Sequence, residues 1–236
     1  MIQHSASLPE RSPRLAPAFD VLVCIYTCEQ DRLFLDEFYD SVVGRYLLQL
    51  PNSPRFEVYA NPFIGQSFHH ATRLVLRASE TYETLSLKTY EMIRYCVQHF
   101  QFCRLLKIDV TTVKKTFDPQ YVGRKPIDLA RLVQFLRESP HEKDYDGFRL
   151  QARHSRQNAM NWARKKGRPI NYESLFGDGP MPPFFNGKCY FLSWEFARFI
   201  SEHGARTAQQ WVESLIGAED VMVGRLFQDF ERSVRQ

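Results

Sequence analysis

The sequence predicts a single-domain α/β fold with a mostly parallel central sheet flanked by helices. Apolar, β-branched runs alternate along the chain with longer segments whose apolar residues recur at helical spacing. That alternation is typical of strands joined by crossover helices. A length of 236 residues, 44% of them apolar and 25% charged, suits one globular core. We expect a flexible N-terminal arm at 1–18 and one folded domain at 19–236.

The first half of the chain opens with an α/β unit. Residues 19–27 form an apolar run typical of a strand buried on both faces, and 33–50 carry a helical pattern that stops at Pro51. A second strand is expected at 55–60, followed by a loop over 61–70.

Residues 80–90 lead into a long amphipathic helix that ends near Phe102. Thr84 or Ser86 is the expected N-cap of this helix. It leads into an apolar run, 104–113, which carries one carboxylate, Asp109. Ligands of open α/β sheets bind outside the carboxyl ends of the strands, so Asp109 is a candidate site residue. The alternative is an ordinary turn-forming Asp at the end of a strand.

The second half continues the alternation of strands and helices as far as the C-terminus. We expect a helix at 128–138, a strand at 145–150, a loop at 177–183, a strand at 184–193, the start of a helix at 194–200 and two helical stretches within 206–234.

The charge pattern argues against nucleic acid as a partner. The net charge is only +4, and the one basic segment, 149–168, is more typical of a solvated helix face and loop than of a nucleic-acid site. The five cysteines lack a paired metal-ligand spacing and indicate reduced thiols.

No stretch of the sequence has the length and apolar character of a signal peptide or a membrane span. We expect a cytoplasmic location and no transmembrane segment, with peripheral membrane contact left open.

Four segments, in this order, resemble blocks of glycosyltransferase family 31, the β-1,3-galactosyltransferase-like enzymes. Residues 82–89 (YETLSLKT) are similar to its Y-x-N-L-T-L-K-T block, and 106–111 (LKIDVT) stand where it has L-K-T-D-D-D. Residues 182–193 (PPFFNGKCYFLS) are similar to P-P-Y-C-S-G-x-G-Y-x-L-S, and 219–224 (EDVMVG) match E-D-V-x-V-G. The resemblance implies the GT-A fold for the domain.

The resemblance also implies an activity and a set of site residues. The expected reaction is the inverting, β-1,3-type transfer of a sugar from a nucleotide donor, with UDP as the expected nucleotide, to a hydroxyl of a glycan or glycolipid acceptor. Asp220 corresponds to the family's catalytic base, with Glu219 beside it as a helper or acceptor contact. The alternative for Asp220 is a helix N-cap.

The remaining expected contacts divide between the donor and the acceptor. Those assigned to the donor are Asp109, Thr111, Lys107 and Lys88, and those assigned to the acceptor or transferred sugar are Asn186, Gly187, Tyr190 and Trp194. Lys188 and Cys189 replace a small residue and Gly of the family pattern, which predicts a bulkier site. Both lysines have the alternative of a surface or supporting charge, and both aromatic residues have the alternative of a core position.

The metal site implied by the resemblance is incomplete. The family holds Mn²⁺ with the first and third positions of an Asp triplet, which are here Asp109 and Thr111. Hard divalent ions prefer several oxygen ligands, so the loss of a carboxylate predicts weak binding of Mn²⁺ or another divalent cation at Asp109. Three explanations stay open: a weakened metal site, a metal-independent transferase in which Lys or Arg replaces the ion, or a non-catalytic relative that binds nucleotide or carbohydrate.

Overall fold

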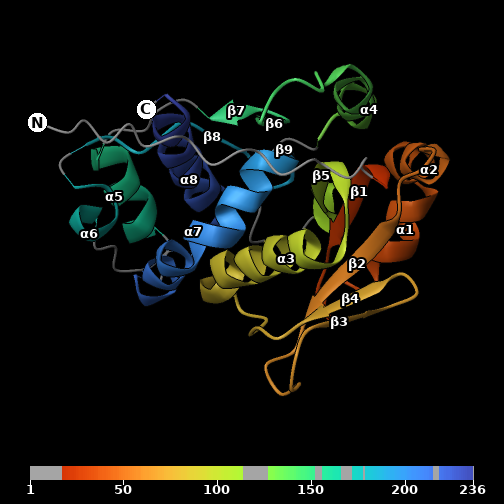
Figure 1. Cartoon of the computed structure of the whole chain (residues 1–236), viewed down its shortest axis with the longest axis horizontal. Helices are drawn as coiled ribbons and strands as arrows, with labels where there is room; N and C mark the ends of the chain where they lie inside the picture. The colour runs from red at the N-terminus through yellow and green to blue at the C-terminus, as the bar shows by residue number, and fades with distance from the viewer. Residues whose placement is uncertain are drawn as a thin grey trace, which may run out of the picture.

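The computed structural model describes residues 18–113, 127–151, 156–165, 172–177, 179–214 and 218–235. All but the last residue of the predicted arm at 1–18 lies outside these ranges, and so does part of the basic segment at 149–168. Within them, a seven-stranded sheet lies between two layers of helices (Figure 1). The predicted α/β class is confirmed.

The sheet is mixed, so the expectation of a mostly parallel sheet is not confirmed in that form. Its order is β3-β4-β2-β1-β5-β9-β6. Parallel pairings join β4, β2, β1 and β5, whereas antiparallel pairings join β3 to β4 and join β9 to both β5 and β6. The seven strands are β1 (Phe19–Tyr26), β2 (Arg55–Ala60), β3 (Phe68–His70), β4 (Arg73–Leu76), β5 (Phe102–Asp109), β6 (Tyr145–Gly147) and β9 (Cys189–Ser193).

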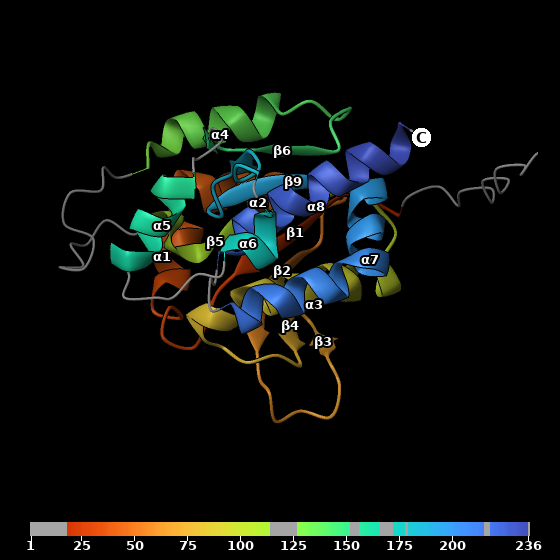
Figure 2. The same cartoon turned by 90° about the vertical axis from the view of Figure 1, so that its left-hand side faces the viewer.

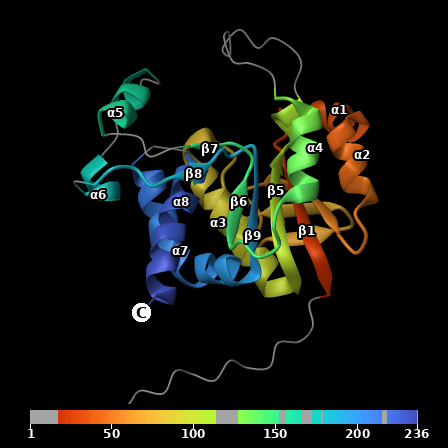
Figure 3. The same ribbon diagram turned by 90° about the horizontal axis from the view of Figure 1, so that it is seen from above.

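Helices cover both faces of the sheet. Figure 3 shows α1, α2 and α4 on one side, with α3, α7 and α8 on the other. The six helices are α1 (Phe34–Asp40), α2 (Val42–Gln49), α3 (Leu85–His99), α4 (Leu129–Glu138), α7 (Trp194–Glu213) and α8 (Glu219–Val234). The remaining elements are η1 (Tyr82–Thr84), η2 (Val110–Val113), β7 (Leu150–Gln151), α5 (Arg156–Lys165), α6 (Tyr172–Phe176) and β8 (Phe184–Phe185).

Strand β1 contributes to the cores on both faces of the sheet. Leu22 and Cys24 pack into the core with α3, α7 and α8, whereas Val23 and Ile25 pack into the core with α1, α2 and α4. All four side chains are fully buried. Because successive side chains on a strand point to opposite faces, a continuous apolar run is what a strand buried on both faces requires.

Several predicted elements are divided in the structure. The helix expected at 33–50 breaks at Ser41, whose extended backbone ends α1 and whose side chain accepts from the Gly44 N–H (3.0 Å) as the N-cap of α2. The strand expected at 145–150 ends at Gly147, and β7 then pairs with β8 in a separate two-stranded sheet.

Three further predictions need correction. The strand expected at 184–193 is divided into β8 and β9 by a turn at 186–188. The helix predicted to start at 194–200 is confirmed as α7, but it continues to Glu213, so the first helical stretch expected within 206–234 is part of α7 and not a separate helix. Strand β3 lies in the segment predicted to be a loop.

The carboxyl ends of the central strands bring the chain's candidate chemistry to one edge of the molecule. Tyr26 at the end of β1 pairs with Asp109 at the end of β5. The first turns of α1 and α3, which follow β1 and β4, lie at the same edge, on the left in Figure 2.

Candidate functional site

Asp109 lies half-buried at the end of β5 and folds the chain back onto itself. Its Oδ1 accepts hydrogen bonds from the Thr111 backbone N–H (2.8 Å) and from Thr111 Oγ1 (2.6 Å). This is the turn-stabilising arrangement that short acidic side chains favour. Asp109 therefore has the turn-forming role that the sequence analysis gave as its alternative, and its second carboxylate oxygen has a different partner.

The second contact comes from the turn between β8 and β9. Because β9 runs antiparallel to β5, Cys189 lies opposite Ile108, and the Asp109 N–H donates to the Lys188 carbonyl oxygen (2.9 Å). The Lys188 ammonium lies 3.5 Å from Asp109 Oδ2 and donates to Thr111 Oγ1. Burial alone would raise the pKa of Asp109, but the charges of Lys188 and Lys107 outweigh burial, so the pKa is lowered.

The start of α8 joins the same turn through two carboxylates. The Gly187 N–H donates to Asp220 Oδ2 (3.0 Å), and the Lys107 ammonium donates to Glu219 Oε1 (2.9 Å) and to the Gly187 carbonyl. Lys107 thus holds the turn and α8 together from beneath. Three segments that are far apart in the sequence meet in one connected network.

Gly187 is required by the closeness of the approach. A Cβ placed on this residue would lie 2.4 Å from Glu219 Oε1 and 3.4 Å from Asp220 Oδ2. Gly224 has a similar role one turn further along α8, where a Cβ would lie 2.7 Å from Phe184 Cβ and from the Pro183 carbonyl. The two glycines let α8 lie directly against residues 183–187.

Asp220 has the electrostatic environment of a general base. Burial, followed by the negative charge of Glu219, raises the pKa of Asp220 to about 7. Its side chain is half-buried, and Ala218, not Asp220, occupies the N-cap position of α8. A carboxyl group with a pKa near the operating pH is suited to accepting a proton.

The two lysines expected to bind the donor are both buried. Side chains of Lys107 and Lys88 are 1% exposed, and each ammonium lies 4.4 Å from the centre of the Tyr26 ring. Lys88 donates to the Thr27 carbonyl (2.5 Å) and pairs with Glu80 (2.5 Å). These positions do not agree with the expected direct contact of Lys107 and Lys88 with a diphosphate, because both ammonium groups are enclosed and bonded within the protein.

Burial affects the two lysines differently. It lowers the pKa of Lys88 in spite of the nearby Glu80. Burial would also lower the pKa of Lys107, but the attraction of Glu219, followed by that of Asp109, outweighs it, so the pKa of Lys107 is raised. Lys107 therefore stays charged beneath the site as a supporting cation.

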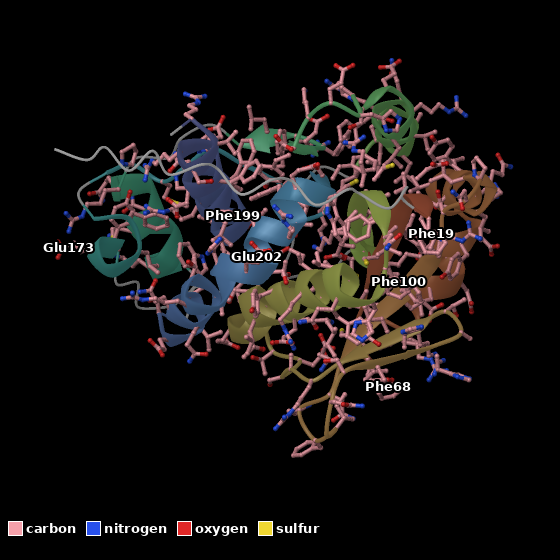
Figure 4. All side chains as sticks on the ribbon, in the orientation of Figure 1. Phe19, Phe68, Phe100, Glu173, Phe199 and Glu202 are labelled. Carbon is pink, nitrogen blue, oxygen red and sulfur yellow. The ribbon has the colours of Figure 1, made fainter. Side chains whose placement is uncertain are left out.

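Of the two aromatic residues assigned to sugar stacking, Tyr190 is a core residue and Trp194 is half-buried against the same core. The Tyr190 ring is fully buried and meets Tyr145 edge-on at 5.9 Å. Trp194 follows Ser193, which pairs with Arg104 at the other end of β5, and its ring contacts Phe102 (4.9 Å). Phe19, labelled in Figure 4, pairs with Phe102 and marks that opposite edge. Asn186 and Gly187 do lie in the turn at the site and are half-buried.

The arrangement around Asp109 does not fit a divalent metal. One carboxylate oxygen accepts two hydrogen bonds from Thr111, and the other faces the Lys188 ammonium. In the part of the chain that the structure describes, no cluster of three or more His, Cys, Asp or Glu side chains forms a metal site. A hard divalent ion needs several free oxygen ligands at close range, which this pair does not offer.

The sequence analysis missed the importance of Lys188, Tyr26 and Glu80. Lys188 was identified only as a bulky replacement. Its place opposite Asp109 depends on the antiparallel pairing of β9 with β5, which the expectation of a mostly parallel sheet did not include. Tyr26, which pairs with Asp109 in the sheet, lies against both buried lysine ammonium groups, and Glu80 forms an ion pair with Lys88.

Comparisons of the chain with protein-family models and with curated proteins find no match. Among the described residues, no helix combines the length and apolar character needed to cross a membrane.

Proposed function

We propose that the chain is an inverting glycosyltransferase with a GT-A-like fold. It transfers a sugar from a nucleotide donor, with UDP as the expected nucleotide, to a hydroxyl of a glycan or glycolipid, forming a β-1,3-type bond. The proposal combines the sequence resemblance with the placement of the residues that carry it. Asp109 lies at the carboxyl end of β5, where open α/β sheets bind their ligands, and the turn at Gly187 brings Asp220, in the first turn of α8, to the same network.

One observation carries the proposal: the segments around Asp109, Gly187 and Asp220 form a single hydrogen-bonded network. Asp109 meets Lys188, Gly187 meets Asp220, and Lys107 joins Gly187 to Glu219. A set of unrelated turn residues has no reason to converge in this way. Convergence of two acids with different environments is what a transfer reaction needs, because one side must hold the donor while the other accepts a proton.

Asp220 is the proposed base. Its raised pKa, about 7, lets the carboxylate accept the proton of the acceptor hydroxyl as the oxygen attacks the anomeric carbon. Glu219 has a supporting role, because its side chain is 10% exposed and paired with Lys107. It raises the pKa of Asp220 and anchors the start of α8, and it is not proposed to contact the acceptor.

The donor diphosphate is proposed to bind beside Asp109 and Lys188. The developing negative charge on the leaving diphosphate needs a positive partner. Lys188, with a side chain 35% exposed, is the cation of this network that solvent reaches, since the side chains of Lys107 and Lys88 are 1% exposed.

The test is turnover of UDP-sugars by the purified full chain, compared with its Asp220→Asn variant. We expect UDP release in the presence of glycan acceptors, with turnover about a hundredfold lower, or lower still, in Asp220→Asn. UDP binding by the two proteins should be equal. Product analysis by NMR should show an inverted anomeric centre.

Two results would count against the proposal in different ways. Turnover that is unchanged in Asp220→Asn would remove this residue from the mechanism. UDP binding with no hydrolysis or transfer of any UDP-sugar, with or without Mn²⁺, would instead favour a non-catalytic nucleotide-binding protein. The pairing of Asp109 with Lys188 is the observation that keeps this second candidate in view.

A further inference from the structure

We propose that the Lys188 ammonium takes the place of a divalent cation at Asp109 and Thr111, so that the donor diphosphate binds without metal. This inference rests on the proposed function, because it concerns how the same site holds its nucleotide. It chooses among three explanations that the sequence left open, and it names the residue responsible.

The position of the ammonium carries the inference. Lys188 Nζ lies 3.5 Å from Asp109 Oδ2 and donates to Thr111 Oγ1, so it contacts both positions at which the family pattern has metal ligands. A divalent ion bound to Asp109 would have to lie beside this ammonium and would be repelled by it. Bidentate binding of the ion would also compete with the two Thr111 hydrogen bonds to Asp109 Oδ1.

The charge balance of the site is preserved by the pair of replacements. Two carboxylates and a divalent ion sum to zero, and so do one carboxylate and one ammonium. Thr111 removes one negative charge where the family pattern has an Asp, and Lys188 supplies one positive charge directly opposite. Each change alone would alter the site's attraction for a diphosphate, whereas the two together leave a cation next to a single acid.

The ammonium is also available to a ligand. The Lys188 side chain is 35% exposed and the Asp109 side chain 24% exposed. Lys188 is anchored at its backbone, where its carbonyl accepts from the Asp109 N–H (2.9 Å) and its own N–H donates to Asn186 Oδ1 (3.0 Å). A lysine with a fixed backbone and an accessible head group is suited to phosphate binding as a point charge.

The first experiment is calorimetric titration of the full chain with UDP, in excess EDTA and again in excess Mn²⁺. The wild-type chain should bind UDP with the same affinity in both, within about twofold. Lys188→Gln should weaken binding in EDTA by about tenfold or more, the usual effect of losing one charge-assisted contact.

Lys143→Gln is the matched control. Lys143 forms a similar half-exposed pair with Asp146 (3.4 Å), on the loop that leads into β6, and the network at Asp109 does not include it. This variant should bind UDP as the wild type does. Circular dichroism of each variant would establish that the fold is kept.

A reciprocal variant tests the cation position without any nucleotide. Lys188→Ala combined with Thr111→Asp restores two carboxylates and removes the ammonium. Electron paramagnetic resonance of added Mn²⁺ should show the ion bound by this double variant and free in the presence of the wild type. Failure of the double variant to bind Mn²⁺ would count against this position as a cation site.

The outcomes separate this inference from the proposed function. If wild-type binding of UDP requires Mn²⁺, or if Lys188→Gln binds UDP as tightly as the wild type, the inference is overturned while a nucleotide-dependent function stands. If the wild type binds no UDP in either condition, the proposed function fails and the inference fails with it.

Discussion

Asp220 combines a catalytic advantage with a cost in stability. A carboxyl group whose pKa is about 7 is a useful base near neutrality, but its folded form holds a proton more tightly than an unfolded Asp, whose pKa is about 3.9. Its contribution to stability is therefore fully present below about pH 4 and is lost as the pH rises through about 7.

This linkage predicts a pH-dependent difference between the wild type and Asp220→Asn. The asparagine does not titrate. The free energy of unfolding of the wild type, minus that of the variant, should therefore decrease between about pH 5 and about pH 8. Urea unfolding at the two pH values measures the difference. A constant difference would mean that the pKa of Asp220 is not raised in the folded protein.

Gly187 is the residue with the least room at the site. In Gly187→Ala, the added Cβ would lie 2.4 Å from Glu219 Oε1, so the Glu219 carboxylate must turn away and its buried ion pair with Lys107 is disturbed. We expect a loss of about 1–3 kcal/mol in the free energy of unfolding, typical of overpacking, together with weaker UDP binding.

Gly65→Ala is the matched control for that change. A Cβ on Gly65 has no atom within 4 Å, so this variant should unfold at nearly the same urea concentration as the wild type. Equal stability of Gly187→Ala and Gly65→Ala would show that the turn at the site yields easily, which the close contact with Glu219 argues against.

At the scale of elements, one buried ion pair links the start of α8 to β5. Glu219 in its first turn reaches Lys107 of β5 at 2.9 Å, and both side chains are at most 10% exposed. A buried pair of this kind is weak evidence for net stability, but removal of one partner leaves the other charge buried and unpaired.

Lys107→Met should therefore lower the free energy of unfolding by about 3–5 kcal/mol, and the double variant Lys107→Met with Glu219→Gln should recover much of the loss. Arg232→Met is a control, because Arg232 and Asp229 form an exposed pair within α8 (3.3 Å) whose removal should cost at most about 1 kcal/mol. Equal losses in the single and double variants would show that Lys107 contributes through packing alone.

The same elements show what the sequence could and could not predict. Strands β1 and β5 follow from apolar runs, which report burial directly. The direction of β9 does not, because an apolar strand looks the same in either orientation. That direction decides whether Lys188 or Trp194 lies beside Asp109, so Trp194 lies at the opposite end of β5 from Asp109, in keeping with the alternative of a packing role, and the role of Lys188 was missed.

The burial of charged side chains was the second feature that the sequence could not predict. Lys88 and Lys107 occur in two of the segments on which the family resemblance rests, and a sequence cannot distinguish an exposed ammonium from one enclosed beside Tyr26. By contrast, the segments 182–193 and 219–224, which the sequence analysis assigned to one site, do meet in the structure. Gly187 donates to Asp220, and Gly187 and Gly224 leave room for α8 to pack against the turn.

At the scale of the whole molecule, the sheet separates two cores that share its strands. The core with α3, α7 and α8 contains Trp211 and contacts Trp194, whereas the core with α1, α2 and α4 contains Ile25. Strand β1 supplies side chains to both, so a loss of packing on one face should be felt on the other. The two cores are then expected to unfold as one cooperative unit.

Ile25→Ala tests this coupling. The loss of a buried Ile should cost about 2–5 kcal/mol. In a Trp162→Phe background, Trp194 and Trp211 are the remaining tryptophans, and both report on the face opposite Ile25. Urea unfolding followed by tryptophan fluorescence and by far-ultraviolet circular dichroism should shift together and by the same amount. A fluorescence transition that stays in place while the dichroism shifts would show that the two cores unfold separately. In that case the network at Asp109 and Asp220 would lie across a boundary between independently folding parts, and its geometry would depend on ligand binding more than the single sheet suggests.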